Sequence, residues 1–84
     1  MSKGEWSEYQ DKEVDNFRKA VGERIKYLRL NRNLCQEAIA DDMNVTTASV
    51  CYWERGRNCL GLDCIYHLAQ SFDVHPRELI PEEW

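Results

Sequence analysis

Four cysteines and two histidines are the side chains in this chain that are best suited to bind a metal ion or act as nucleophiles. The closest cysteines, Cys59 and Cys64, have four residues between them, and His67 and His75 have seven. Neither spacing is that of a zinc site. We therefore expect reduced thiols, no metal and no cofactor. With no nucleophile–base pair or phosphate-binding loop, we expect no enzymatic activity either. A disulfide and a thiol-sensing role for Cys51 are the alternatives.

The second chemistry that the side chains offer is hydrogen bonding from one helix face to a polar surface. One face of a short helix would be left small and polar by Thr46, Thr47, Ala48, Ser49, Cys51 and Tyr52. Such a helix suits the major groove of DNA, where Thr47 can offer a hydroxyl to a base and a methyl to thymine. No Arg, Lys, Gln or Asn lies between Thr46 and Glu54. We therefore expect one of two outcomes: modest specificity, or readout by methyl contacts, Tyr52 and DNA shape.

The charges are distributed unevenly along the chain, which carries a net charge of −4 at pH 7. Residues 1–17 hold two basic and five acidic side chains, a net charge of −3. Residues 18–60 hold eight basic and five acidic side chains, net +3, and residues 61–84 hold one basic and five acidic, net −4. The overall acidity argues against a nucleic-acid partner, but the polar helix lies in the one positive segment.

The length of 84 residues predicts one small domain. No apolar run approaches the roughly 20 residues that span a bilayer, so we expect no contact with a membrane. The acidic N-terminus has no apolar segment of the kind that signal peptides contain. The sequence therefore predicts a cytoplasmic protein.

Apolar periodicity predicts an all-α domain over residues 12–84, preceded by a flexible acidic arm over residues 1–11. The first helix, from about residue 12 to 31, carries one apolar stripe: Val14, Phe17, Val21, Ile25 and Leu28. Four further helices are expected at about 36–43, 47–54, 62–72 and 75–79. The face that the fourth buries is expected to hold Leu62, Ile65, Leu68, Ala69 and Phe72.

The residues between the second and third helices predict a tight connection. Asn44 is suited to a left-handed backbone, Thr46 to the N-cap of the third helix, and Gly56 to the stop after it. Ala40 is small at the point where the two helices must cross at close range. This arrangement predicts two short helices braced crosswise.

The residues that carry a family resemblance are spread over residues 20–80: Gly22, Ile25, Leu28, Arg29, Leu34, Gln36-Glu37-Ala38-Ile39-Ala40, Val45, Val50, Glu54-Arg55-Gly56, Leu68-Ala69, Val74 and Glu78-Leu79-Ile80. On these residues the chain resembles the Xre/Cro and phage-repressor family of helix-turn-helix regulators. The resemblance implies a five-helix bundle of the lambda-repressor-like DNA-binding type. Its third helix would read the major groove, usually within a homodimer on a pseudo-palindromic operator.

The resemblance also implies roles for single residues. Gln36, at the start of the second helix, corresponds to a glutamine that touches a phosphate or a base edge. Groove-facing positions fall on Thr46, Thr47, Ala48 and Tyr52, and the phosphate contacts expected just beyond the third helix fall on Arg55, Arg57 and Asn58. Cys35 departs from the pattern, because it stands where Ser or Thr usually caps the second helix and a thiol is a weak acceptor.

Two further sets of residues are predicted to build the protein rather than read DNA. In similar proteins the arginine and glutamate at the positions of Arg29 and Glu54 pair, and we expect a buried, bidentate pair here; two solvated surface charges are the alternative. Leu79, Ile80 and Trp84 can either close the core or form a dimer face, and we expect the dimer face.

The sequence therefore predicts a sequence-specific DNA-binding transcriptional regulator, a repressor that binds double-stranded DNA as a homodimer. The alternative is a helix-turn-helix scaffold that binds a protein partner, in the manner of an antitoxin. The uncharged face of the third helix and the net acidity favour the alternative, whereas Gln36, Arg55 and Arg57 favour DNA.

Overall fold

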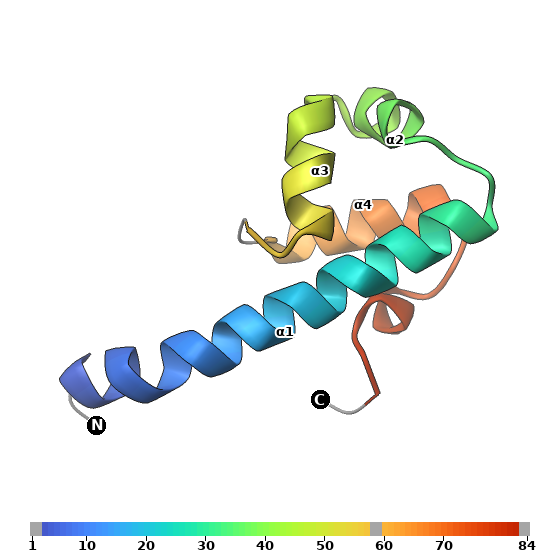
Figure 1. Cartoon of the computed structure of the whole chain (residues 1–84). Helices are drawn as coiled ribbons and strands as arrows, with labels where there is room; N and C mark the ends of the chain where they lie inside the picture. Colours follow the sequence, from blue (N-terminus) through green and yellow to red (C-terminus); the bar gives the residue numbers. More distant parts are fainter. Residues whose placement is uncertain (1–2, 58–59, 83–84) are drawn as a thin grey trace.

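The computed structural model describes residues 3–57 and 60–82, and it describes the side chains of residues 12–57 and 60–82 (Figure 1). Over these residues the elements are α1 (Lys3–Asn31), α2 (Gln36–Met43), α3 (Thr47–Glu54), α4 (Leu62–Phe72) and the 3-10 helix η1 (Pro76–Leu79). The described residues contain no strand, so the all-α class is confirmed. None of the helices there is both long and apolar enough to cross a membrane.

The first helix begins much earlier than the sequence predicted, at Lys3 rather than near Lys12. Gly4 lies in the first turn, where it interrupts few helical hydrogen bonds. Figure 1 shows the N-terminal part of α1 extending beyond the other helices. The boundary between a flexible arm and the domain at residue 12 stays a prediction.

The expected fifth α-helix is wrong, because the segment forms only the four-residue 3-10 helix η1. Its hydrogen bonds join residues three apart, from Glu78 N to His75 O at 2.8 Å and from Ile80 N to Arg77 O at 3.1 Å. Pro81 disfavours a helical backbone at Ile80, which is extended at φ −100° and ψ 122°. The segment between the two prolines is therefore too short for an α-helix.

A single core joins all five elements. Its members, each at most 5% exposed, are Val21, Ile25, Leu28, Ile39, Ala40, Val50, Trp53, Leu68, Ala69, Phe72 and Leu79. Leu62 contradicts the prediction for α4, because its side chain is 84% exposed. It is the first residue of α4 and lies one turn before Ile65, the first α4 residue of the predicted face to pack against the core.

Candidate nucleic-acid interface

The turn between α2 and α3 is fixed by backbone hydrogen bonds. Asn44 adopts the predicted left-handed conformation, at φ 57° and ψ 47°, and its N–H bonds the carbonyls of Ala40 and Asp41. The N–H of Val45 donates to the same Ala40 carbonyl at 2.9 Å. Because Ala40 is only 3% exposed, its small side chain also marks where the two helices pack. The turn therefore holds α2 and α3 at a defined angle.

Side-chain caps begin both helices. The Sγ of Cys35 accepts from Ala38 N at 3.4 Å, so the thiol occupies the cap that a hydroxyl was expected to fill. Thr46 Oγ1 accepts from Ser49 N at 3.2 Å and lies 3.0 Å from Ser49 Oγ. The Thr46 hydroxyl is thus engaged in capping α3, and Thr47 becomes the more suitable hydroxyl for an outside partner.

The outer face of α3 carries the residues that were predicted to face a groove. Thr46, Thr47, Ala48 and Tyr52 are all exposed. On the inner face, Val50 is fully buried and Trp53 is 5% exposed. The helix therefore presents small and hydroxyl-bearing side chains outward from a firmly packed base.

Arg29 and Glu54 contact each other in the interior between α1 and α3. Arg29 Nε donates to Glu54 Oε2 at 2.6 Å, and Arg29 Nη2 donates to Glu54 Oε1 at 3.1 Å. The two side chains are 9% and 4% exposed, so the geometry is both bidentate and buried. A third bond runs from Arg29 Nη1 to Leu34 O at 2.8 Å. The hydrogen bond to Glu54 raises the pKa of Arg29 and outweighs burial, which lowers it.

Gln36 extends this pair toward the surface through a contact that the sequence did not predict. Its Nε2 donates to Glu54 Oε1 at 3.0 Å, and its side chain is half-buried. The amide carries two hydrogens, so one remains for a partner outside the protein. The first residue of α2 and the last of α3 are thus joined directly. The only hint in the sequence is that both residues belong to the family pattern.

Two glycines allow α1 and the end of α3 to approach closely. A Cβ on Gly22 would lie 2.5 Å from Trp53 O and 2.6 Å from Glu54 O. Gly56 has φ +72°, and a Cβ there would lie 2.8 Å from the backbone of Lys19. Both contacts exclude a side chain, so the position of α3 depends on them.

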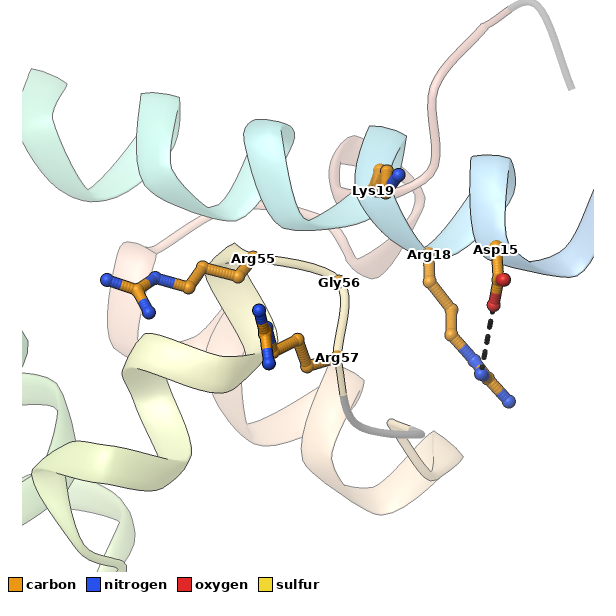
Figure 2. A pocket seen from close by; sticks show the side chains of 6 residues that line it. All are labelled: Asp15, Arg18, Lys19, Arg55, Gly56 and Arg57. Carbon is orange, nitrogen blue, oxygen red and sulfur yellow. Dashed lines mark ion pairs between the residues drawn. The ribbon is translucent and has the colours of Figure 1, made fainter.

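Arg55 and Arg57, which were predicted to contact phosphate, are exposed just beyond α3. They line a hollow of about 590 Å³ together with Gly56 and the α1 residues Asp15, Arg18 and Lys19 (Figure 2). The α1 contribution was not predicted, because it comes from a segment far away in the sequence. Asn58, the third predicted phosphate contact, lies outside the described residues.

The residues predicted to form a dimer face do not all lie at the surface. Leu79 is fully buried in the single chain, where it completes the core, so its assignment to a dimer face is wrong. Ile80 is half-buried against the core, and Trp84 lies outside the described residues. The most exposed large apolar side chain among the described residues is Leu62 on α4, at 84%, and Tyr66, one turn later, is 54% exposed. Tyr27 and Leu30 on α1 are each exposed to the same extent as Tyr66.

Comparison with known proteins places this geometry in a family. The helix-turn-helix family model matches residues 25–79, which is more than half of the chain. The chain therefore belongs to the helix-turn-helix family of DNA-binding transcriptional regulators. A curated relative, an uncharacterized HTH-type transcriptional regulator called y4aM from Sinorhizobium fredii, is 32% identical over 56 residues. This match covers 67% of the chain but only 39% of the relative.

Solved structures share the same fold. The restriction-modification controller protein C.AhdI from Aeromonas hydrophila is 34% identical, with a TM-score of 0.71, and the match covers 74% of this chain and 94% of that one. A hypothetical transcription factor from Neisseria, NHTF, is 25% identical with a TM-score of 0.72, over 80% and 79% of the two chains. The DNA-binding domain of BldD, 20% identical with a TM-score of 0.72 over 80% and 97%, shows the fold alone.

Proposed function

We propose that this chain represses transcription by placing α3 in the major groove of a specific duplex site. The observation that carries the proposal is the exposed face of α3, small and hydroxyl-bearing, on a helix fixed from behind by Val50 and Trp53. A buried bidentate pair, Arg29 with Glu54, holds the end of that helix against α1. A helix held so firmly can enter the groove without losing further conformational entropy.

Base contacts in this proposal come from Thr47, Ala48 and Tyr52. The Thr47 hydroxyl bonds a base edge, and its methyl and that of Ala48 contact thymine methyls. Ala48 and Tyr52 lie four residues apart on α3 and therefore share a face. Thr46 contributes its methyl, since its hydroxyl caps the helix.

Phosphate contacts accompany these base contacts. Gln36 uses its second amide hydrogen on a phosphate oxygen, with the amide held in place by Glu54 at the C-terminal end of α3. Arg55 and Arg57 supply charge just beyond the same end of α3, and Asn58 follows them in the sequence. These contacts fix the position of α3 but carry no sequence information.

The protein acts as a homodimer in this proposal, because one helix pair covers too little DNA for tight specific binding. Leu62 and Tyr66, four residues apart on α4, provide an exposed apolar face for a second copy. Ile80 and Trp84 stay candidates for the dimer contact from the sequence prediction. Leu62→Gln is expected to weaken dimerisation at least about fivefold in sedimentation equilibrium, because burying a polar side chain without a partner costs over ~1 kcal/mol. Leu30→Gln, at an equally apolar exposed position on α1, is the control.

Selection from random duplex DNA at moderate salt tests the function. The wild type is expected to enrich a palindromic consensus. Thr47→Ala should reduce the preference for one base pair in each half-site, by about 1–3 kcal/mol of binding free energy. Thr47→Ser keeps the hydroxyl and Thr47→Val keeps the methyl, so the two variants assign the contact.

Binding to a protein partner is the second candidate function. The observations in its favour are the outer face of α3, which lacks Arg, Lys, Gln and Asn, and the net charge of −4. If random-duplex selection enriches no sequence and binding to mixed duplex shows no steep loss with salt, the DNA proposal is wrong. The exposed α3 face would then be the place to seek an antitoxin-type contact.

A further inference from the structure

The hollow between α1 and the turn after α3 brings together basic side chains from two distant segments. Arg18 and Lys19 come from α1, and Arg55 and Arg57 flank Gly56. The two segments touch through backbone, because a Cβ on Gly56 would lie 2.8 Å from Lys19 Cα and 3.0 Å from Arg18 C. The convergence of four positive charges is therefore built into the packing of α3 on α1.

The arrangement of these side chains suits an extended anion better than a small one. Figure 2 shows Arg55 and Arg57 extending to one side of the Gly56 turn, while Arg18 lies on the other side with Asp15. Lys19, Arg55 and Arg57 are exposed, and Arg18 is half-buried. One DNA strand carries a phosphate about every 3.4 Å along the helix axis, so cations on different sides of the turn can meet different phosphates.

One carboxylate opposes such a ligand. Asp15 Oδ1 lies 3.5 Å from Arg18 Nη1, and the Asp15 side chain is 62% exposed. It reduces the positive potential at the α1 side of the hollow. Removing this carboxylate should therefore favour an anion at the hollow.

We propose that this hollow binds the sugar-phosphate backbone of duplex DNA, with Lys19 and Arg18 of α1 contacting phosphates beyond those reached by α2 and α3. The inference rests on the proposed DNA-binding function. It extends the binding surface to α1, the element that begins well before the family match at residue 25. The contacts are to phosphate alone, so they raise affinity for every sequence by the same factor.

Two variants of opposite sign test the proposal by salt titration of duplex binding. Lys19→Ala is expected to weaken binding about 3- to 10-fold near 0.1 M salt and to reduce the slope of log K against log salt by about 1. Asp15→Asn is expected to strengthen binding about 2- to 5-fold, because it removes the repulsion between this carboxylate and the phosphates. Both effects should be equal on the selected site and on random duplex.

Matched controls remove the same charges elsewhere. Lys26→Ala takes an exposed lysine from the same helix, and Asp73→Asn takes an exposed carboxylate from the end of α4, where Asn tolerates the left-handed backbone. If each control changes affinity as much as its partner variant, the hollow has no role of its own and the proposal is overturned. Unchanged circular dichroism and melting temperature confirm that the variants fold.

The failure of this inference differs from failure of the proposed function. If the wild type binds the selected site, Thr47→Ala changes that binding and Lys19→Ala does not, the proposed function stands and the role of the hollow is wrong. A wild type without salt-dependent duplex binding loses both. Inorganic phosphate at constant ionic strength should not compete with DNA; Lys19-dependent competition at millimolar phosphate would identify a free phosphate site instead and overturn the assignment to DNA.

Discussion

Two arginine–glutamate pairs join α1 to different elements, and they differ strongly in burial. Arg29 reaches Glu54 at the end of α3, with side-chain exposures of 9% and 4%. Arg24 reaches Glu78 in η1 at 3.1 Å, with exposures of 34% and 44%. Arg24 also donates to the Glu78 carbonyl at 2.7 Å and lies 5.2 Å from the centre of the Tyr27 ring.

The difference shows that burial, and not the residue pair, decides what such a contact does. Around Arg24, water solvates both charges, so the pair adds little and can be lost cheaply. Around Arg29, the surrounding protein has removed water from both groups, and each depends on the other for hydrogen bonds. The inner pair therefore fixes the position of α3, which bears the proposed base contacts, while the outer pair only adds to the attachment of η1.

Removal of the inner carboxylate should destabilise the protein more than any other single substitution in either pair. Glu54→Ala leaves the Arg29 guanidinium buried without its main partner and frees Gln36. We expect the free energy of unfolding to fall by about 3–5 kcal/mol. Urea denaturation measures this loss. A midpoint equal to that of the wild type would show that the pair is solvated in solution.

A double variant separates the value of the pair from the cost of stranding one half. Arg29→Met with Glu54→Leu replaces both charges by apolar side chains, and it should destabilise less than Glu54→Ala alone.

Titration of Arg29 should not change the stability that the pair contributes until the pH is high. Because the pKa of Arg29 is raised in the fold, its contribution is complete below the ordinary pKa of arginine and lost only as pH rises through the folded value.

Gly22→Ala tests whether the inner pair depends on the close approach of α1 and α3. The added methyl would meet Trp53 O at 2.5 Å and Glu54 O at 2.6 Å, so the helices must separate. We expect a loss of about 1–3 kcal/mol, typical of overpacking, even though Ala favours helices more than Gly. The reverse change, Ala20→Gly at a half-buried position on the same helix, measures the propensity effect with opposite sign, together with the loss of one half-buried methyl. A stabilised Gly22→Ala protein would contradict the close contact.

Much of this architecture could be predicted because local rules agree with it. Asn44, Thr46 and Gly56 are each suited to the backbone that they adopt, and periodic apolar residues place α1 and α3. The Arg29–Glu54 contact required more, since the residues lie on different helices. It came from the resemblance and not from spacing. Family membership thus supplied a long-range contact that no local pattern contains.

The features that were missed are those that depend on packing between distant segments or on helix ends. The contact of Gln36 with Glu54 and the hollow beside Lys19 both arise only once α3 lies across α1. Leu62 fits an apolar period, but periodicity does not show that the first turn of α4 lies outside the core. For Leu79 the apolar tail suggested a dimer face, and only the fold shows how η1 buries it.

The outer pair gives the smallest expected effect and completes the comparison. Glu78→Ala removes the contact from Arg24 Nη2 but keeps the bond from Arg24 Nε to the Glu78 carbonyl, so the loss should be under ~1 kcal/mol. Salt sharpens the contrast with Glu54→Ala. At about 1 M NaCl the Debye length is about 3 Å, so the difference between Glu78→Ala and the wild type should become smaller. The cost of Glu54→Ala should persist, because ions do not reach a pair with side chains 9% and 4% exposed. Equal salt sensitivity of the two variants in urea denaturation would mean that burial does not distinguish the pairs.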